Sequence, residues 1–477
     1  MLKKIIINEW RDLYADRMLS LLLLLFVFAT VYGIYNGASW ARQQAVAEEQ
    51  LSSIWDQKLA EYKSQLSDNR QATARFGVQL SQNPYLMSAQ KVDVALPPAV
   101  LAVLSVGQSD LYLNNTQAYL WSDADNLFAK TDLQNPLNLI IGRFDLAFVV
   151  VFLFPLIILA FSYNLLSSEK ENGTLGLLLS QPVPLRQVLF GKVLARILVI
   201  FPALILTVLL GLLITGNKIG TFEGGVKFLL WCGIVVFYGL FWFALAVLVN
   251  SFDYNSPTNA TALAGIWLIF VIIVPSLLNT ATTILYPIPA RSELIVASRE
   301  AQPDVEKEGE QILAKFYEDN PELRPIANEA EISDFRRKLL LVFLNDRKEV
   351  APLIEKYDSQ LNKRQSFISQ FSLFSPAVIT QEALNDIAGT GFVRYQTFRE
   401  QVNRFVEINR QFYVPKIIKG EKLTASDYEL IPRFRFSEEA IGNLSSRVGF
   451  SLAGLVILLV FCLSGIFYKL RQFSIIG

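Results

Sequence analysis

The chain contains no histidine and only two cysteines among its 477 residues. Histidine is the commonest metal ligand and the commonest acid–base catalyst near neutral pH, so its absence leaves only carboxylates or thiolates for enzymatic chemistry. Both cysteines, Cys232 and Cys462, lie in apolar stretches, where free thiols behave as small buried hydrophobes. We therefore predict no disulfide framework, no metal site and no catalytic site in this chain.

Two further features of many nucleotide- or nucleic-acid-binding proteins are missing. Neither sign of charge is in excess, since 43 Lys and Arg residues balance 43 Asp and Glu residues, so we predict no nucleic-acid partner. The chain also lacks a glycine-rich phosphate loop. Gly191 and Lys192 are adjacent, but the upstream glycine and the following Ser or Thr of such a loop are absent. The chain itself is therefore not expected to bind ATP.

Apolar residues make up 52% of the chain and the mean hydropathy is +0.35, which is typical of a membrane protein. Six apolar runs are long enough to cross a bilayer as helices. We predict a mainly α-helical, polytopic membrane protein with six transmembrane helices and a mostly helical extracytoplasmic domain. The predicted parts are an interfacial amphipathic helix (1–17), a first transmembrane helix (18–36), a first extracytoplasmic segment (37–143), transmembrane helices two to five (144–286), a second extracytoplasmic segment (287–446), and a sixth transmembrane helix with a cytoplasmic tail (447–477).

A polar segment at 169–184 separates the second and third apolar runs. It begins with charged and amide side chains at Glu169 to Asn172, and Gly173 then interrupts the helix. Thr174 is placed to cap a short new helix over 175–180. Pro182 and Pro184 end that helix. The pattern predicts a short, stiff helix at the membrane surface.

This segment, SSEKENGTLGLLLSQPVPLRQVLFGK, resembles the cytosolic coupling helix in permease subunits of ABC transporters of the type-2 exporter class. Two other stretches, NPLNLIIGRFDLAFVVVFLFPLIILAFSYNLLSSE and SPAVITQEALNDIAGTGFVRY, resemble a subgroup of these permeases with a large extracytoplasmic domain of unknown function. The residues of the first segment that match the family pattern are Glu169, Glu171, Gly173, Thr174, Leu175, Leu178, Leu179, Pro182, Val183, Gly191 and Lys192.

The resemblance implies a permease subunit that couples ATP hydrolysis by a separate cytosolic ATPase to movement of an unidentified substrate. That ATPase would bind ATP and Mg²⁺, and this chain would need no cofactor. The residues implied in coupling to the ATPase are Glu169, Glu171, Gly173, Thr174, Leu175, Leu178 and Pro182. The other expected partners are a second permease chain (the same or a similar paralogue), the lipid bilayer, and a periplasmic or envelope protein.

Basic residues indicate the orientation in the membrane. Lys and Arg are more numerous beside the predicted inner ends of the apolar runs, for instance at Lys3, Lys4 and Arg471, than beside the outer ends. By the positive-inside rule, both termini are predicted to be cytoplasmic, in a bacterial inner membrane. The amphipathic start of the chain fits either simple anchoring at the interface or direct contact with an ATPase.

A second functional interpretation stays open. In a mechanotransmitter, ATP-driven motion would reach the extracytoplasmic domain without moving a substrate, and a long rigid stalk would be needed. The stretch 41–66 keeps a helical period, so the first transmembrane helix is expected to continue out of the membrane. A third and weaker alternative is a receptor or scaffold independent of any ATPase.

Asp145, at the start of the second apolar run, is a candidate gate or substrate-path residue. The alternative is a carboxylate that pairs with Arg143 or caps the helix. In the second polar segment, helical periodicity predicts two core-facing stripes. They are Ile332, Phe335, Leu339, Val342 and Phe343 on one helix, and Phe398, Val402, Phe405 and Ile408 on another.

The topology can be tested by labelling single cysteines in a variant that lacks Cys232 and Cys462. Cysteines at Ser122 and Ser359 should react with an impermeant thiol reagent added outside intact cells, because both positions lie in predicted extracytoplasmic segments. A cysteine at Ser180 should react only after the cells are opened. Labelling of position 180 from outside would overturn the assignment.

Overall fold

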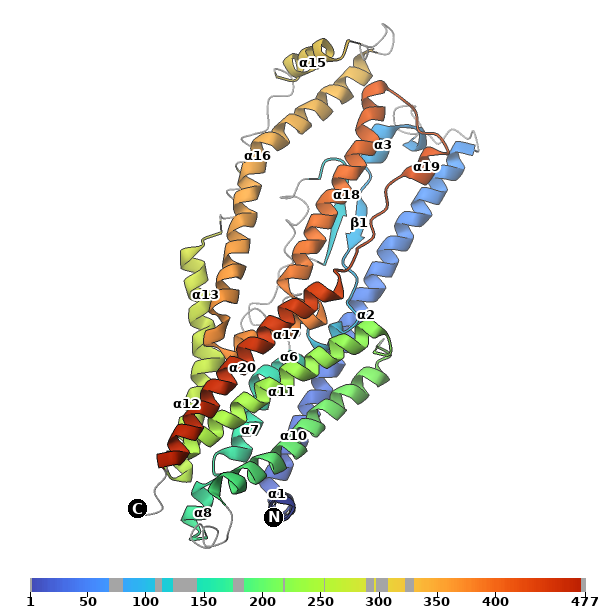
Figure 1. The fold of residues 1–477 in the computed structure, drawn as a ribbon. Coiled ribbons are helices and arrows are strands. Elements are labelled where there is room, and N and C mark those ends of the chain that lie inside the picture. The colour runs from blue at the N-terminus through green and yellow to red at the C-terminus, as the bar shows by residue number, and fades with distance from the viewer. Residues whose placement is uncertain are drawn as a thin grey trace.

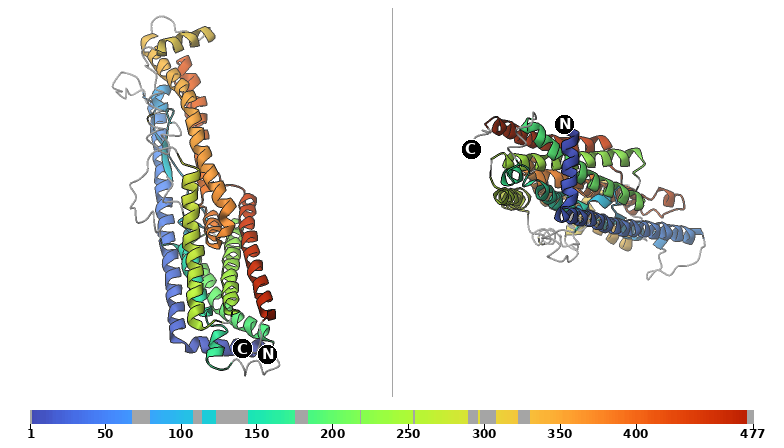
Figure 2. Two further views of the ribbon diagram at one scale, coloured as in Figure 1. Left: turned by 90° about the vertical axis from the view of Figure 1, so that its left-hand side faces the viewer. Right: turned by 90° about the horizontal axis from the view of Figure 1, so that it is seen from below.

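The structure is a computed structural model that describes residues 2–67, 80–107, 114–122, 144–174, 184–217, 219–252, 254–288, 296, 308–321 and 330–472. The molecule is elongated, and its N- and C-terminal ends lie together at one end of it (Figure 1). We call this the terminal end and the opposite one the distal end. A bundle of long helices occupies the terminal half, and a smaller region of helices with two short strands occupies the distal half (Figures 1 and 2).

Six helices in the described residues are long and apolar enough to cross a membrane, which confirms the predicted fold class. Two of them are broken by π-helical turns, and one of these two is also extended by a short helix. In chain order they are α2 (Arg17–Ser67), α6 (Leu146–Phe148) with η4 (Val149–Leu153), α7 (Phe154–Ser162) and α8 (Ser167–Glu171), α10 (Leu185–Ile214), α11 (Phe222–Asn250), α12 (Ser256–Leu268) with η5 (Ile269–Ile273) and α13 (Val274–Leu285), and α20 (Ile441–Gln472).

Each of the two π-helical turns lies just before a proline, at Pro155 and Pro275. Proline has no backbone N–H, so carbonyl oxygens four or five residues earlier lose their helical partner. A hydroxyl from elsewhere in the fold replaces that partner in both cases. Tyr238 donates to the carbonyl of Val151 at 2.8 Å, and Ser375 donates to the carbonyl of Phe270 at 2.6 Å. In an apolar layer these contacts satisfy backbone groups that water cannot reach.

The distal half contains the remaining elements. They are η1 (Leu80–Gln82), α3 (Pro84–Ser88), β1 (Val92–Ala95), η2 (Ala102–Leu104), β2 (Asn115–Ala118), α15 (Glu308–Asp319), α16 (Ala330–Phe371), η7 (Ser372–Phe374), α17 (Pro376–Ala388), α18 (Phe392–Lys419) and α19 (Asp427–Leu430). Strands β1 and β2 pair in antiparallel fashion, with Val92 opposite Ala118. α1 (Leu2–Ala15) lies across the terminal end and not along the bundle (Figure 2).

One core fills the distal half, and both polar segments of the chain contribute to it. Met87, Val94 and Leu120 from the first segment are buried with Phe398 and Val402 from the second. The predicted stripe on α18 is therefore confirmed at Phe398, Val402 and Phe405. It is wrong at Ile408, whose side chain is 45% exposed, and the α16 stripe is wrong at Phe335, which is 58% exposed. Among the described side chains of α16, the buried apolar positions are Leu340 and Val342, and only Leu340 of these two belongs to the distal core.

A single helix joins the two halves. Phe26 and Ile34 of α2 are buried in the core of the terminal half, and Trp55 and Leu59 of the same helix are buried in the distal core. The helix runs without interruption for 51 residues, as the periodicity of 41–66 predicts. At 1.5 Å per residue it is about 75 Å long.

The short helix α17 connects the halves in a different way. It belongs to the predicted segment 287–446, and it packs against α11 and α20 of the helical bundle. Ala377, Ile379, Ala383 and Leu384 on it belong to the core of the terminal half. Residues of the second polar segment thus form part of the core of the bundle, because this helix carries apolar side chains at helical spacing toward it. The extracytoplasmic position of the segment stays a prediction.

The structure also changes one part of the labelling test. Ser122 is only 2% exposed, so a thiol at that position would be shielded on either side of the membrane. Asn115 on β2 is exposed and belongs to the same segment, and it is the better position. Ser359 is exposed on α16, whereas Ser180 lies outside the described residues.

Close packing at Gly37 generates a stability prediction. A Cβ added there would lie 2.1 Å from the carbonyl oxygen of Val103, so Gly37→Ala should push α2 away from η2 and destabilise the protein by about 1–3 kcal/mol. Gly442→Ala is the matched control, because nothing lies within 4 Å of the added atom. The measurement is the thermal unfolding midpoint of each purified variant. A Gly37→Ala midpoint equal to that of the wild type would contradict the prediction.

Candidate functional site

The segment that joins α7 to α10 is the candidate coupling site. Its described part is α8, with Asn172, Gly173 and Thr174 after it. Gly173 has a φ of 72°, the left-handed conformation that glycine adopts without steric cost, and it ends the helix as predicted. Leu175, Leu178 and Pro182 lie outside the described residues. The predicted short helix at 175–180 stays a prediction.

Glu169 points inward and forms an ion pair with α10. Its carboxylate lies 2.7 Å from Nζ of Lys192, and it also accepts a hydrogen bond from the Thr174 hydroxyl. The Lys192 side chain is only 9% exposed. The ion pair is therefore shielded from water and from salt, and the carboxylate fixes the turn at Thr174 to the body of α10.

The same lysine connects to the N-terminal helix α1. Nζ of Lys192 lies 3.1 Å from Glu9, and Nη1 of Arg196 lies 3.3 Å from the other oxygen of that carboxylate. The indole of Trp10 donates to the carbonyl of Ala195 at 3.0 Å. Two carboxylates and two cations thus balance in one cluster, which we call the ion cluster: Glu9, Glu169, Lys192 and Arg196. It ties α1, α8 and α10 together.

Glu171 binds a different helix. Its carboxylate accepts from the backbone N–H of Ser256 at 2.7 Å and from the Ser256 hydroxyl at 2.8 Å. Ser256 is the first residue of α12, and a negative charge at a helix N-terminus is favourable. Beneath this contact, Ser167 hydrogen-bonds to Ser256 through their hydroxyls at 2.8 Å.

Buried amide side chains attach the end of α7 and the start of α8 to α11. Nδ2 of Asn250 donates to the carbonyl of Ser162 at 3.1 Å, and its Oδ1 accepts from the N–H of Leu166. Asn250 and Asn259 are both almost fully buried. The end of α7, where the backbone leaves the helix, thereby has its polar groups satisfied by side chains of α11. The candidate coupling segment is bonded directly to three helices, α10, α11 and α12, and through Lys192 of α10 it is linked to α1.

Sequence reasoning identified Glu169 and Glu171 but not their partners. Glu9 could have been found, because it shares a helical face with Ile5 and the buried Leu13, and a carboxylate on an apolar face implies a buried partner. Lys192 and Arg196 lie one turn apart on α10. Nothing in the sequence pairs them with Glu9, since that contact joins residues far apart in the chain.

Asp145 lies at the other end of the second transmembrane helix. Its carboxylate caps α6 by accepting from the N–H of Phe148 at 2.7 Å, and it also accepts from the N–H of Val106 at 2.8 Å. Burial raises the pKa of this carboxyl, while the backbone donors oppose that shift. Asp145 thus caps the helix, which is the second of the two predicted roles. Its carboxylate also joins α6 to the segment after η2. Arg143 lies outside the described residues, and a role of Asp145 as a gate stays a prediction.

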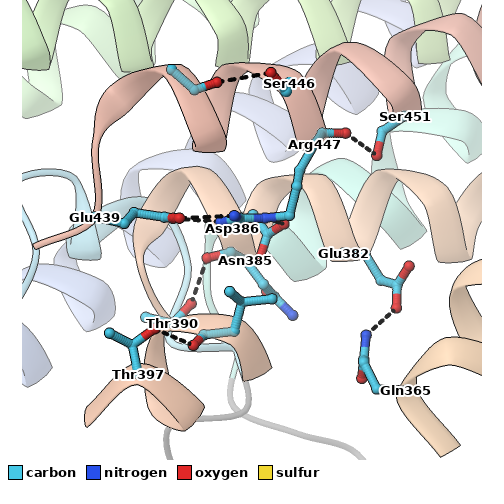
Figure 3. A network of polar contacts seen from close by, with 12 residues as sticks. Gln365, Glu382, Asn385, Asp386, Thr390, Thr397, Glu439, Ser446, Arg447 and Ser451 are labelled. Carbon is cyan, nitrogen blue, oxygen red and sulfur yellow. Dashed lines mark hydrogen bonds and ion pairs between the residues drawn. The ribbon is translucent and has the colours of Figure 1, made fainter. Parts of the chain in front are cut away.

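A polar network surrounds α17 where the two halves meet (Figure 3). Arg447 of α20 lies 3.3 Å from the carboxylate of Asp386 and 2.8 Å from that of Glu439. On the other side of α17, the Ser105 hydroxyl donates to Asn385 at 2.8 Å. Together with the bond between Ser375 and the π-helical turn η5, these contacts fix α17 to two transmembrane helices and to the first polar segment.

A cavity of about 900 Å³ lies beside this network, bounded by α16, α17, α18 and α20. Glu382 of α17 lines it and accepts a hydrogen bond from Gln365 of α16 at 2.9 Å. Within the described residues, no group of three or more Cys, Asp or Glu side chains is placed to hold a metal ion.

Comparison with known proteins gives two matches. A family model described as "ABC-2 family transporter protein" matches residues 4–470. A curated relative, "Probable ABC transporter permease protein NosY" of Stutzerimonas stutzeri, is 32% identical over 136 residues, which are 27% of this chain and 48% of that protein. The chain thus spans about half the length of this relative.

The ion cluster generates a prediction about α1. Lys192→Met leaves Glu169 without its cation and Glu9 with Arg196 alone, and the loss of the one charge-assisted bond from Lys192 to α1 costs about 1.5–3 kcal/mol. Amide hydrogen exchange of residues 2–15 should therefore become about 10- to 100-fold faster. Lys227→Met is the matched control, because Lys227 is equally shielded but pairs with Glu223 on α11. Equal exchange of α1 in both variants would show that the ion cluster does not hold it.

Proposed function

Because this chain belongs to the ABC-2 transporter family and is a membrane permease of an ABC transporter, we propose that it couples ATP hydrolysis by a separate cytosolic ATPase to movement of a substrate across or out of the membrane. ATP and Mg²⁺ bind to that ATPase in this proposal. The partners are two such ATPase subunits and a second permease chain. The distal half is the extracytoplasmic domain, and both termini face the cytoplasm of a bacterium.

The attachment of the coupling segment to α10, α11 and α12, and through α10 to α1, carries the proposal. A partner that pushes on residues 169–184 moves α8, and α8 cannot move without α10 and α1, to which Glu169 and Lys192 bind it. Glu171 transfers the same displacement to the first turn of α12. Both carboxylate contacts are charge-assisted, and such hydrogen bonds are about twice as strong as neutral ones.

A route from this segment to the distal half supports the same proposal. α12 is held at its first residue by Glu171, and the π-helical turn that follows α12 is held at Phe270 by Ser375. The two contacts are about 20 Å apart along one helix. Ser375 is the N-cap of α17. Displacement of α12 along its axis would therefore reach α17 and the distal half.

Two further parts of the proposal, the cytoplasmic position of the termini and the pairing with a second permease chain, are supported by the surface of the protein. Lys3, Lys4 and Arg471 are exposed at the terminal end, where basic residues favour the cytoplasmic side. The helix formed by α12, η5 and α13 is the least buried of the six candidate spans. Its exposed apolar side chains, among them Ile269, Ile273 and Leu277, offer a surface for a second permease chain.

One observation favours mechanotransmission as a second candidate. α2 passes unbroken from the terminal core into the distal core, as a stalk for transmitting force requires. In this interpretation the distal half is the output and a periplasmic or envelope protein is the receiver. The two candidates share the coupling segment and differ only in whether a molecule crosses or leaves the bilayer.

The test uses the full chain reconstituted in proteoliposomes with its ATPase. Glu169→Ala/Glu171→Ala should still insert, because neither residue lies within an apolar run, but should lower stimulation of the ATPase at least fivefold, since both carboxylate attachments of α8 are lost. Glu48→Ala/Glu49→Ala removes the same charge from α2 outside the coupling segment, where Glu49 is exposed and Glu48 is half-buried, and should change nothing. Wild-type stimulation in the first variant would refute the proposed coupling.

The same vesicles separate the two candidate functions. Loss of a co-purified lipid or peptide from the membrane on addition of ATP supports export. ATP-dependent movement of the distal half, with no molecule moved, supports mechanotransmission.

A further inference from the structure

The cavity beside α17 has both polar and apolar residues in its lining. Amides of α16 and α18, including Asn362, Gln365 and Gln396, line it together with Leu373, Phe450 and Gly454. Phe450 lies within a candidate membrane span and is 78% exposed. The cavity thus reaches from the polar network to an exposed aromatic side chain of this candidate span.

The charge in the cavity is negative. Glu382, Asp386 and Glu400 line it, and the only basic lining residue among those described is Arg447. That guanidinium is already bonded to Asp386 and to Glu439, which lies outside the lining. Anionic ligands would therefore meet uncompensated carboxylates, whereas a cation would be attracted.

Glu382 is the group best placed to meet a cation. Gln365 fixes its position through a bond of 2.9 Å, and the carboxylate lines the cavity (Figure 3). Burial, together with the nearby carboxylate of Asp386, raises the pKa of Glu382 to about 7. A bound cation would favour the ionised carboxylate, so binding and loss of a proton are linked.

We propose that this cavity binds a primary ammonium group carried on an apolar chain, with the ammonium at Glu382 and the chain along Leu373 and Phe450. The three N–H donors of an ammonium group suit a lining rich in carboxylate, amide and hydroxyl oxygens. The side chains of Leu373 and Phe450 offer apolar surface to a hydrocarbon chain. The volume is in the range of sites for small ligands. A bare metal ion is disfavoured, since no group of three or more ligating side chains is assembled among the described residues.

The proposal goes beyond the proposed function, because binding here requires neither an ATPase nor transport. The ammonium could belong to a lipid headgroup or to a free long-chain amine. Two probes separate these sources: a photoreactive phosphatidylethanolamine in phosphatidylcholine nanodiscs, and a photoreactive twelve-carbon primary amine. Photoreactive phosphatidylcholine and the trimethylated amine are the controls, as they keep the positive charge but lack N–H donors.

The full chain is titrated with each probe, and the crosslinked peptides are identified by mass spectrometry. At least one primary-amine probe should label peptides containing Leu373 or Phe450, with a half-saturating concentration at least tenfold below that of its methylated control. Glu382→Gln keeps the size of the side chain and should raise the half-saturating concentration at least tenfold. Ser366→Trp, at an exposed position on the cavity lining, should do the same by filling the space.

Glu355→Gln is the matched control, since it removes a charge from an exposed position on α16 that does not line the cavity. Its half-saturation should equal that of the wild type. Binding to the wild type should also tighten between pH 6 and pH 8 as Glu382 loses its proton, and this dependence should vanish in Glu382→Gln. The other charged groups facing Glu382 in the described lining are Asp386 on α17, Glu400 on α18 and Arg447 on α20.

Labelling by the lipid alone, by the free amine alone or by both supports the proposal and identifies the source. Wild-type affinity in Glu382→Gln, equal labelling by the methylated probes, or labelling confined to peptides outside the cavity would overturn it. These results do not depend on the ATPase assay, so the failure of one proposal is distinguishable from the failure of the other.

Discussion

The structure depends on one constraint: polar groups inside an apolar helical bundle must find partners within the protein, because water does not reach them. The bundle concentrates its polar contacts at its two ends. At the terminal end the ion cluster and the buried amides Asn250 and Asn259 hold the coupling segment. At the other end Asp145, Asn385 and Arg447 hold α17 and its neighbours. These polar layers fix particular helices to one another at each end of the bundle.

The two prolines in the middle of the bundle show the same constraint on a smaller scale. Each proline removes a donor, each freed carbonyl is satisfied by a hydroxyl from another helix, and the result is a cross-link at a defined depth. The link from Ser375 to Phe270 is the more consequential one, because it joins a transmembrane helix to α17. A backbone defect that would weaken an isolated helix here becomes a point of attachment between helices.

The overall architecture was predictable because apolar runs and helical periods are local properties of the sequence. The six candidate spans, the extension of α2 and the break at Gly173 follow from spacing alone. The packing of α17 against α11 and α20 did not follow, because its short apolar face resembles that of any helix in a soluble domain. The misplaced core residues Phe335 and Ile408 have a related cause. Periodicity identifies a face of a helix, but only the tertiary fold decides how far along the helix that face is covered.

The candidate coupling residues were found by resemblance and their contacts were not. Glu169 and Glu171 were expected to face an ATPase, yet the structure shows both engaged within the chain, one with Lys192 and the other with Ser256. Ion pairs between distant residues leave no signal in a single sequence. The cavity beside Glu382 was likewise invisible, since its lining comes from α16, α17, α18 and α20.

The length of α2 has a geometric consequence for the size of the motions involved. A rigid rod amplifies rotation in proportion to its length. If α2 tilts by about 5° around its start at Arg17, its side chains near Gly37 move by about 3 Å, while its distal tip, about 75 Å away, moves by about 6–7 Å. The same rotation would therefore carry Trp55 and Leu59, and the distal core built on them, over several bond lengths, farther than the parts of α2 inside the bundle.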